Sequence, residues 1–134
     1  MNPVAANSIT DVGGAESVTP PSIVSDLGEL VRPGYKFTTV LADPPWRYSN
    51  TSSRGAAENH YPTMTLKQIC DEPVGELVRD RAHLHLWTTN AFLEAAFKVI
   101  RAWGFNYKSC LVWAKPKIGM GNYWRVSHEF LLLG

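Results

Sequence analysis

Hydrophobic residues along the chain occur in short blocks whose spacing alternates between that of strands and that of helices. Residues 37–42, Phe-Thr-Thr-Val-Leu-Ala, are apolar or β-branched and lie between Gly34 and two prolines, which predicts a buried strand. The same texture at residues 84–88, 109–114 and 129–133 predicts three further strands.

The segments between these strands include two predicted helices. Apolar side chains recur at three- and four-residue steps from Phe92 to Trp103, and we expect Asn90 to cap this helix and Gly104 to end it. A shorter helix is predicted to begin directly after its cap, Thr65. Because strands and helices alternate, we expect an α/β fold with a mainly parallel sheet.

The first 33 residues have a different texture. They are rich in Ser, Thr, Gly, Pro and Ala and show little sustained hydrophobic periodicity. We expect residues 1–33 to form a mobile N-terminal arm, with a short helical turn at 23–30, and residues 34–134 to form the folded portion.

Charge is unevenly distributed along the chain. The formal net charge is +1, yet residues 95–128 contain six Lys or Arg side chains and no acidic residue, interleaved with seven aromatic residues. This mixture is typical of a surface that binds nucleic acid, although a solvated basic face over core aromatic residues has the same composition.

Two cysteines far apart in the sequence match no paired metal spacing, which favours a reduced protein of the cytoplasm or of a nucleus. The sequence contains no run of about 18 apolar residues, so we expect no membrane partner.

The strongest candidate for chemistry is Asp43-Pro44-Pro45-Trp46, directly after the first predicted strand. Sheets of α/β proteins bind ligands at the carboxyl ends of their strands. The prolines lack N–H groups, so the turn is expected to present carbonyl acceptors without competing donors. A carboxylate and a proline carbonyl can accept both hydrogens of an exocyclic amino group, and Trp46 can stack on a base. The alternative is that Asp43 caps a turn and that Trp46 belongs to the core.

Two motifs that contain histidine have competing interpretations. His83 and His85 alternate on one predicted strand and so face the same side, but no third metal ligand is evident nearby, and we expect no metal site. His128 and Glu129 precede the last strand, where an ordering contact is favoured over a catalytic pair.

Four motifs between Leu41 and Gly134 together resemble the family of the seventy-kilodalton catalytic subunit of mRNA N6-adenosine methyltransferase, which includes bacterial and phage DNA relatives. They are Ala-Asp-Pro-Pro-Trp-Arg-Tyr at 42–48, His-Tyr-Pro-Thr-Met at 60–64, Leu-Trp-Thr-Thr-Asn at 86–90 with Trp-Gly-Phe at 103–105, and Trp-Ala-Lys at 113–115 running through Gly-Met-Gly-Asn-Tyr-Trp-Arg to His-Glu at 128–129. Their order and spacing are similar to those of the family.

The resemblance implies a Rossmann-like, S-adenosylmethionine-dependent methyltransferase fold that is incomplete at its C-terminus. It implies methyl transfer from S-adenosylmethionine to the N6 amino group of adenine in DNA, or with less support in RNA, with the base flipped into the pocket. Asp43 and Pro44 are expected to hold the amino group, Pro45 and Trp46 to shape the cleft, and Asp43 also to approach the cofactor.

The resemblance also implies substrate-binding residues, namely Tyr48, Tyr61, Lys115, Asn122 and Arg125. Lys115 and the glycine-rich loop after it resemble a gate on the substrate side. We expect no general base, because attack of an amine on a sulfonium methyl group needs positioning more than prior deprotonation.

In the family's order of motifs, a Lys-Pro-containing helix and a further cofactor-binding strand follow the position of Gly134. A second hypothesis is therefore a truncated or degenerate relative that binds nucleic acid or a partner subunit without catalysis. Both hypotheses leave a homodimer and a heterodimer open.

Overall fold

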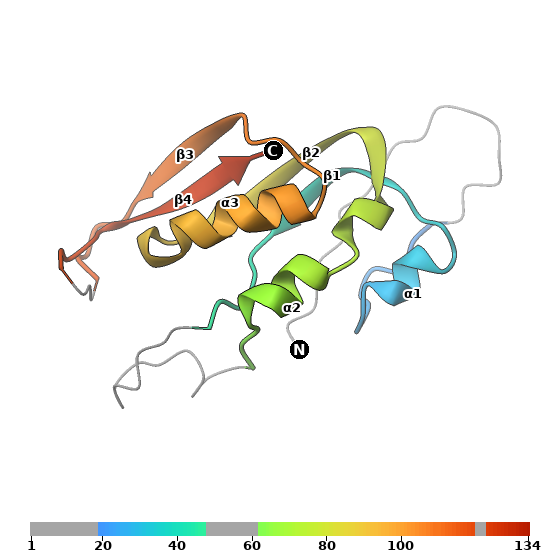
Figure 1. The fold of residues 1–134 in the computed structure, drawn as a ribbon, viewed down its shortest axis with the longest axis horizontal. Helices are drawn as coiled ribbons and strands as arrows, with labels where there is room; N and C mark the ends of the chain where they lie inside the picture. The colour runs from blue at the N-terminus through green and yellow to red at the C-terminus, as the bar shows by residue number, and fades with distance from the viewer. Residues whose placement is uncertain (1–18, 48–61, 120–122) are drawn as a thin grey trace.

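The computed structural model describes residues 19–47, 62–119 and 123–134. In chain order, the elements within these ranges are α1 (Gly28–Val31), β1 (Phe37–Ala42), α2 (Leu66–Asp71), the 3-10 helix η2 (Val74–Leu77), β2 (Val78–Thr88), the 3-10 turn η3 (Asn90–Phe92), α3 (Leu93–Ala102), β3 (Ser109–Ala114) and β4 (His128–Leu133) (Figure 1). None of the described helices is long and apolar enough to cross a membrane.

The described strands form one sheet in the order β1-β2-β4-β3. β1 and β2 pair in parallel, whereas β4 is antiparallel to both of its neighbours, so the expectation of mainly parallel pairing is wrong. The cause is the connection between β3 and β4. Residues 115–127 carry no described helix, and a parallel connection needs a crossover that is usually helical, so the chain turns back as a hairpin.

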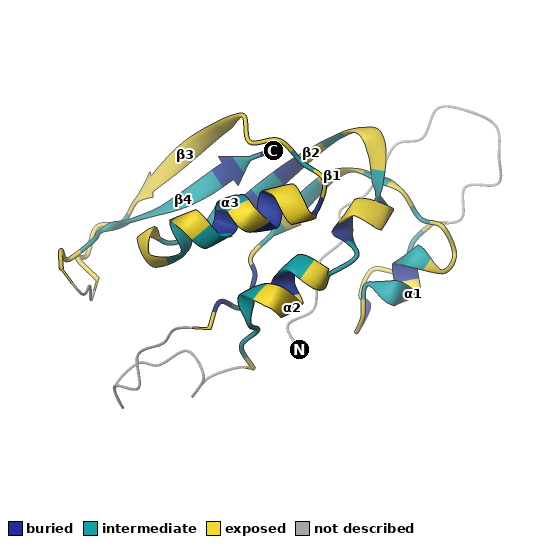
Figure 2. Cartoon of the chain, viewed as in Figure 1, coloured by how far each residue is buried: buried dark blue, intermediate teal, exposed yellow. Residues whose placement is uncertain are grey.

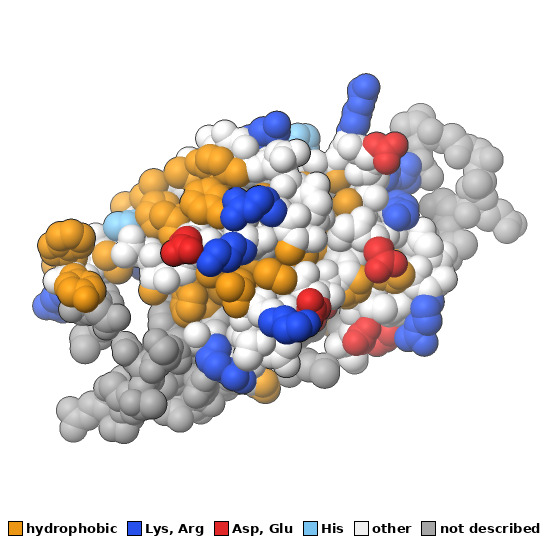
Figure 3. Space-filling model, in the orientation of Figure 1, with side chains coloured by type: hydrophobic (Ala, Val, Ile, Leu, Met, Phe, Trp, Pro, Cys, Tyr) orange, Lys and Arg blue, Asp and Glu red, His pale blue; other side chains and the backbone are white. Residues whose placement is uncertain are grey.

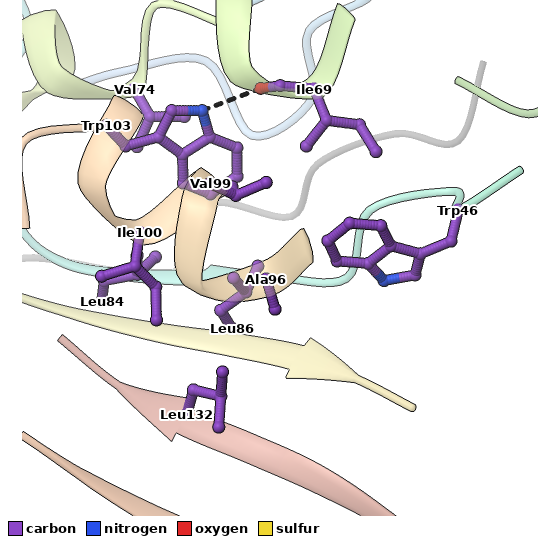
Figure 4. Close-up of a cluster of buried hydrophobic side chains, with 10 residues drawn as sticks. All are labelled: Trp46, Ile69, Val74, Leu84, Leu86, Ala96, Val99, Ile100, Trp103 and Leu132. Atoms are coloured by element: carbon purple, nitrogen blue, oxygen red, sulfur yellow. Dashed lines mark hydrogen bonds between the residues drawn. The ribbon is translucent and has the colours of Figure 1, made fainter. Parts of the chain in front are cut away.

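The core lies between the sheet and the helices α2 and α3, which cover one of its faces (Figures 1 and 2). Alternate side chains of β2 point into this layer, and Leu84 and Leu86 are fully buried beneath Ala96 and Ile100 of α3. Trp103 closes the layer at the end of α3, where its indole Nε1 donates to the carbonyl oxygen of Ile69 at 2.8 Å (Figure 4).

The opposite face of the sheet is formed by the other set of alternating side chains. In the strand register, Leu41 of β1, Trp87 of β2 and Leu111 and Trp113 of β3 all belong to this face. Leu41, Leu111 and Trp113 are about half exposed or more, and no described helix packs over them. The described residues therefore build a sheet that is covered on one side.

The observed helix ends agree only in part with those predicted from the sequence. Thr65 caps α2 as predicted, and with Gln68 it forms a reciprocal capping box. Gly104, with a φ of 85°, ends α3 as predicted. The expectation that Asn90 caps α3 is wrong, because a turn of 3-10 helix intervenes and the N-cap position falls on Phe92.

The segment around α1 packs against the rest of the chain. Val24 and Leu30 are buried in a small cluster with Leu77 of η2, with Tyr35 and Phe37 at its border. The predicted helical turn at 23–30 is present as α1, although it begins later and ends one residue beyond. Residues 1–18 of the predicted arm lie outside the described residues, and the division of the chain at residue 33 stays a prediction.

Candidate active site

Four chain segments meet at one edge of the sheet. β1, β2 and β3 run in the same direction and end there, while the antiparallel β4 begins there. Asp43 follows β1, Lys115 follows β3, and Glu129 lies opposite Trp113 in the second strand pair from the turn. The hairpin thus brings residues that are far apart in sequence to the edge where Asp43 lies.

The carboxylate of Asp43 is available as a hydrogen-bond acceptor at this edge. The residue is exposed, and its carboxylate accepts no hydrogen bond from the described part of the chain, so the alternative that it caps a turn is not supported. Partial burial of the carboxylate, and secondarily repulsion from Glu129, raises the pKa of Asp43 above its ordinary value of 3.8. A hydrogen-bond donor or a positive charge on a ligand would stabilise the ionised form of this carboxylate.

The proline carbonyls do meet competing donors, contrary to the expectation from sequence. The Pro44 oxygen accepts the backbone N–H of Trp46 at 2.8 Å, which closes a three-residue turn around Pro45. The Pro45 oxygen accepts the N–H of Met64, also at 2.8 Å, and Trp46 forms an isolated parallel bridge with Met64. Pro44 is buried. Each carbonyl retains a second lone pair, so neither proline oxygen is saturated by these bonds.

Trp46 packs as a core residue. It is 6% exposed and belongs to the main cluster of buried side chains (Figure 4). Its ring stacks on Phe92, and its Nε1 donates to the carbonyl oxygen of Trp87 at 3.4 Å. The indole faces therefore pack within the protein, which is the alternative that the sequence left open for this residue. Its contribution to the site is to anchor the turn that carries Asp43.

Lys115 and Glu129 form an ion pair across the base of the β3–β4 hairpin. The Lys115 ammonium also lies 5.0 Å from the ring centroid of Trp113, and the Lys115 backbone N–H donates to the Ser127 oxygen at 2.6 Å. Glu129 thus makes the ordering contact that was favoured over a catalytic pair. Its electrostatic influence on Asp43 was missed, because a mainly parallel sheet would not have placed it there.

The remaining predicted substrate-binding residues lie around the hairpin or outside the described chain. Arg125 is exposed, and its Nε donates to the Gly119 oxygen at 3.4 Å. Tyr48, Tyr61 and Asn122 lie outside the described residues, so their predicted roles stay predictions.

His83 and His85 share the sheet face that α3 does not cover, as their alternation predicted. Within the described ranges, no group of three or more His, Cys, Asp or Glu side chains could hold a metal ion. Two surface hollows lie at the opposite edge of the sheet, one around Val78–Arg81 and one that also reaches Phe105 and Lys108. Neither is lined by Asp43, so neither belongs to this site.

The sequence that forms this sheet matches a known protein family. The MT-A70 family model matches residues 37–133, a range that begins with β1 and ends with β4. The chain is also similar to the type II methyltransferase M.MunI of a Mycoplasma species, with 29% identity over 120 aligned residues. That alignment covers 75% of this chain and 52% of the relative, so the chain spans about half the length of the curated relative that it matches.

Proposed function

Because the chain belongs to the MT-A70 family, we propose that it carries the adenine-binding residues of a methyltransferase that acts on the N6 amino group of adenine in nucleic acid. The observation that supports the proposal best is the carboxylate of Asp43, which is exposed at the carboxyl edge of β1 and accepts no hydrogen bond from the described part of the chain. Ligands of α/β proteins bind at this edge.

Asp43 and Pro44 supply the acceptors that an exocyclic amino group needs. The amino group of adenine has two N–H donors; one bonds to the Asp43 carboxylate, and the other to the free lone pair of the Pro44 carbonyl. Accepting both hydrogens favours a pyramidal nitrogen whose lone pair points away from the ring. The buried Trp46 and the bond from Met64 to Pro45 hold this turn in place.

The described residues fit one part of the proposed methyl donor. S-adenosylmethionine supplies, when bound, an electrophilic methyl group on a positively charged sulfur. The Asp43 carboxylate, with Glu129 nearby, makes this edge of the sheet favourable for positive charge. We infer that Asp43 faces both ligands, and that the full fold is of the Rossmann-like methyltransferase type.

We propose DNA as the substrate in preference to RNA, with nucleic acid held by the basic and aromatic residues between 95 and 128. The test is to incubate the chain with S-adenosylmethionine and adenine-containing DNA or RNA oligonucleotides, and to digest the products for mass spectrometry. The proposal predicts N6-methyladenine, with more in DNA. Methylation at another base or position would contradict it.

One observation favours a second function. The sheet face that carries Leu41, Leu111 and Trp113 is apolar and exposed, which suits a module that is completed by further polypeptide. In that case the chain positions nucleic acid or a partner subunit without catalysis. Calorimetric titration with S-adenosylmethionine distinguishes the two functions, because a chain that binds none of the methyl donor cannot transfer methyl groups by itself.

A further inference from the structure

The tip of the β3–β4 hairpin carries large side chains that contact little of the protein. Tyr123 is 95% exposed, Trp124 is 83% exposed, and Ile118 on the other side of the hairpin is 59% exposed. Side chains of this size are rarely left in water together unless they contact a ligand or partner. Figure 3 shows hydrophobic side chains gathered at this end of the molecule, beside a basic one.

The hairpin is supported well enough to hold these side chains outward. Beyond the last strand pair, Ala114 with His128, the Gly119 N–H donates to the Val126 oxygen at 2.8 Å. A Cβ atom on Gly119 would come within 3.1 Å of the Val126 oxygen, so glycine permits this close approach. The two legs of the hairpin therefore remain paired past the end of the sheet.

The charges beside these aromatic residues are positive. Lys117 and Arg125 are exposed on the same hairpin, and the sequence between 95 and 128 contains no acidic residue. Exposed rings that can stack on bases, next to cations that can contact phosphates, are the arrangement by which proteins hold unpaired nucleic acid. An apolar protein partner would have no use for the cations.

The hairpin also starts from the edge of the sheet where Asp43 lies. Its base is the Lys115–Glu129 ion pair, and Glu129 is close enough to Asp43 to raise the pKa of its carboxyl group. From this edge of the sheet the β3–β4 hairpin projects outward, beyond the ends of β3 and β4 (Figure 1).

We propose that Tyr123 and Trp124 form a stacking platform for unpaired bases that flank the target adenine, with Lys117 and Arg125 on the phosphates. The inference rests on the proposed function in that the ligand is nucleic acid. It goes further by assigning residues to the flanking nucleotides and by specifying unpaired strands.

The test is fluorescence anisotropy with the full chain and a labelled single-stranded DNA oligonucleotide. The double variant Y123S/W124S is expected to bind about tenfold or more weakly at every salt concentration. Y123F/W124F keeps the rings and should bind within about twofold of the unmodified chain. Ile23→Ser, an exposed apolar residue near α1, is the matched control and should change nothing.

The salt dependence separates stacking from charge. K117Q/R125Q should flatten the slope of log Kd against log salt, whereas Y123S/W124S should leave that slope unchanged. Unchanged oligonucleotide affinity in Y123S/W124S would overturn the inference. The inference would also fail if, in analytical ultracentrifugation, Y123S/W124S lost self-association while its DNA affinity stayed the same. If the hairpin binds DNA but no adenine is methylated, the proposed function fails and this inference stands; if methylation occurs while Y123S/W124S binds normally, the reverse holds.

Discussion

The indole of Trp46 stacks on the ring of Phe92, with centroids 5.3 Å apart and 14° between the ring planes. This contact divides the Asp43-Pro44-Pro45-Trp46 motif into two parts with different roles. Asp43 is exposed and free to accept hydrogen bonds from a ligand, while Trp46 fixes the turn to the start of α3. Substitutions at the two ends of the motif should therefore have separable effects.

Truncation of Trp46 should mainly reduce stability. Trp46→Ala removes a buried ring and its stacking contact with Phe92. We expect the free energy of unfolding to fall by about 3–5 kcal/mol. Trp46→Phe keeps an aromatic ring against Phe92 and loses the bond to the Trp87 oxygen, so it should cost about 1 kcal/mol. Urea denaturation monitored by circular dichroism measures both; equal stability of Trp46→Ala and the unmodified chain would show that the ring is not a core element.

Asp43→Asn should stabilise the fold at neutral pH. The folded state raises the pKa of Asp43, so ionisation costs more in the folded chain than in the unfolded one. Below pH 3.8 the carboxyl group is protonated in both states and the variant should match the unmodified chain; the difference should appear as the pH rises through the folded pKa.

Urea denaturation at both pH values measures this difference. Glu94→Gln is a control of opposite sign, since the hydrogen bond with Lys98 lowers the pKa of Glu94. This variant should therefore lose stability at neutral pH and regain it in acid. A stability gain of Asp43→Asn that persisted unchanged below pH 3.8 would rule out ionisation as its cause.

Removal of the neighbouring negative charge should lower the pKa of Asp43. Glu129→Gln eliminates the repulsion but not the partial burial, so the pKa should fall while remaining above 3.8. Carbon-detected NMR titration of the Asp43 carboxyl group reports this directly. An unaltered titration curve would mean that Glu129 does not influence Asp43 and that the hairpin base lies farther from the site.

Loss of the α2 cap should have a modest, local cost. Thr65→Ala removes the side chain that accepts the Gln68 N–H, and we expect about 1 kcal/mol less stability in urea. Lys67→Ala in the same helix breaks only an exposed pair with Asp71, and should change stability by less than about 0.5 kcal/mol. Similar losses in the two variants would argue against a specific role for the cap.

Local sequence signals predicted most individual elements, but not how the strands associate. β1 and β3 have the predicted bounds because their apolar runs end at prolines, a glycine or polar residues, and β4 differs by one residue. β2 begins at Val78 rather than at residue 84, since Arg79, Asp80 and Arg81 lie at its exposed start, where pairing does not require apolar side chains. The antiparallel insertion of β4 depends on contacts across the sheet, which periodicity along one strand does not report.

The same limit applies to the candidate site. Asp43 could be identified because its position after a strand and its proline neighbours are local features. The roles of Phe92 and Glu129 could not, because each acts on the motif through a contact formed only when distant segments meet. The prediction of Trp46 as a free stacking face neglected the apolar surface available where the 3-10 turn enters α3.

The account depends most on Asp43 as the acceptor for the adenine amino group. The direct measurement is mass-spectrometric quantification of N6-methyladenine formed on a single-stranded DNA by the unmodified chain and by a folded Asp43→Asn variant, with Asp80→Asn as the control. The account predicts product from the unmodified chain and from the control, and at least about a hundredfold less from Asp43→Asn. Near-normal methylation by Asp43→Asn, or no product from the unmodified chain, would contradict it.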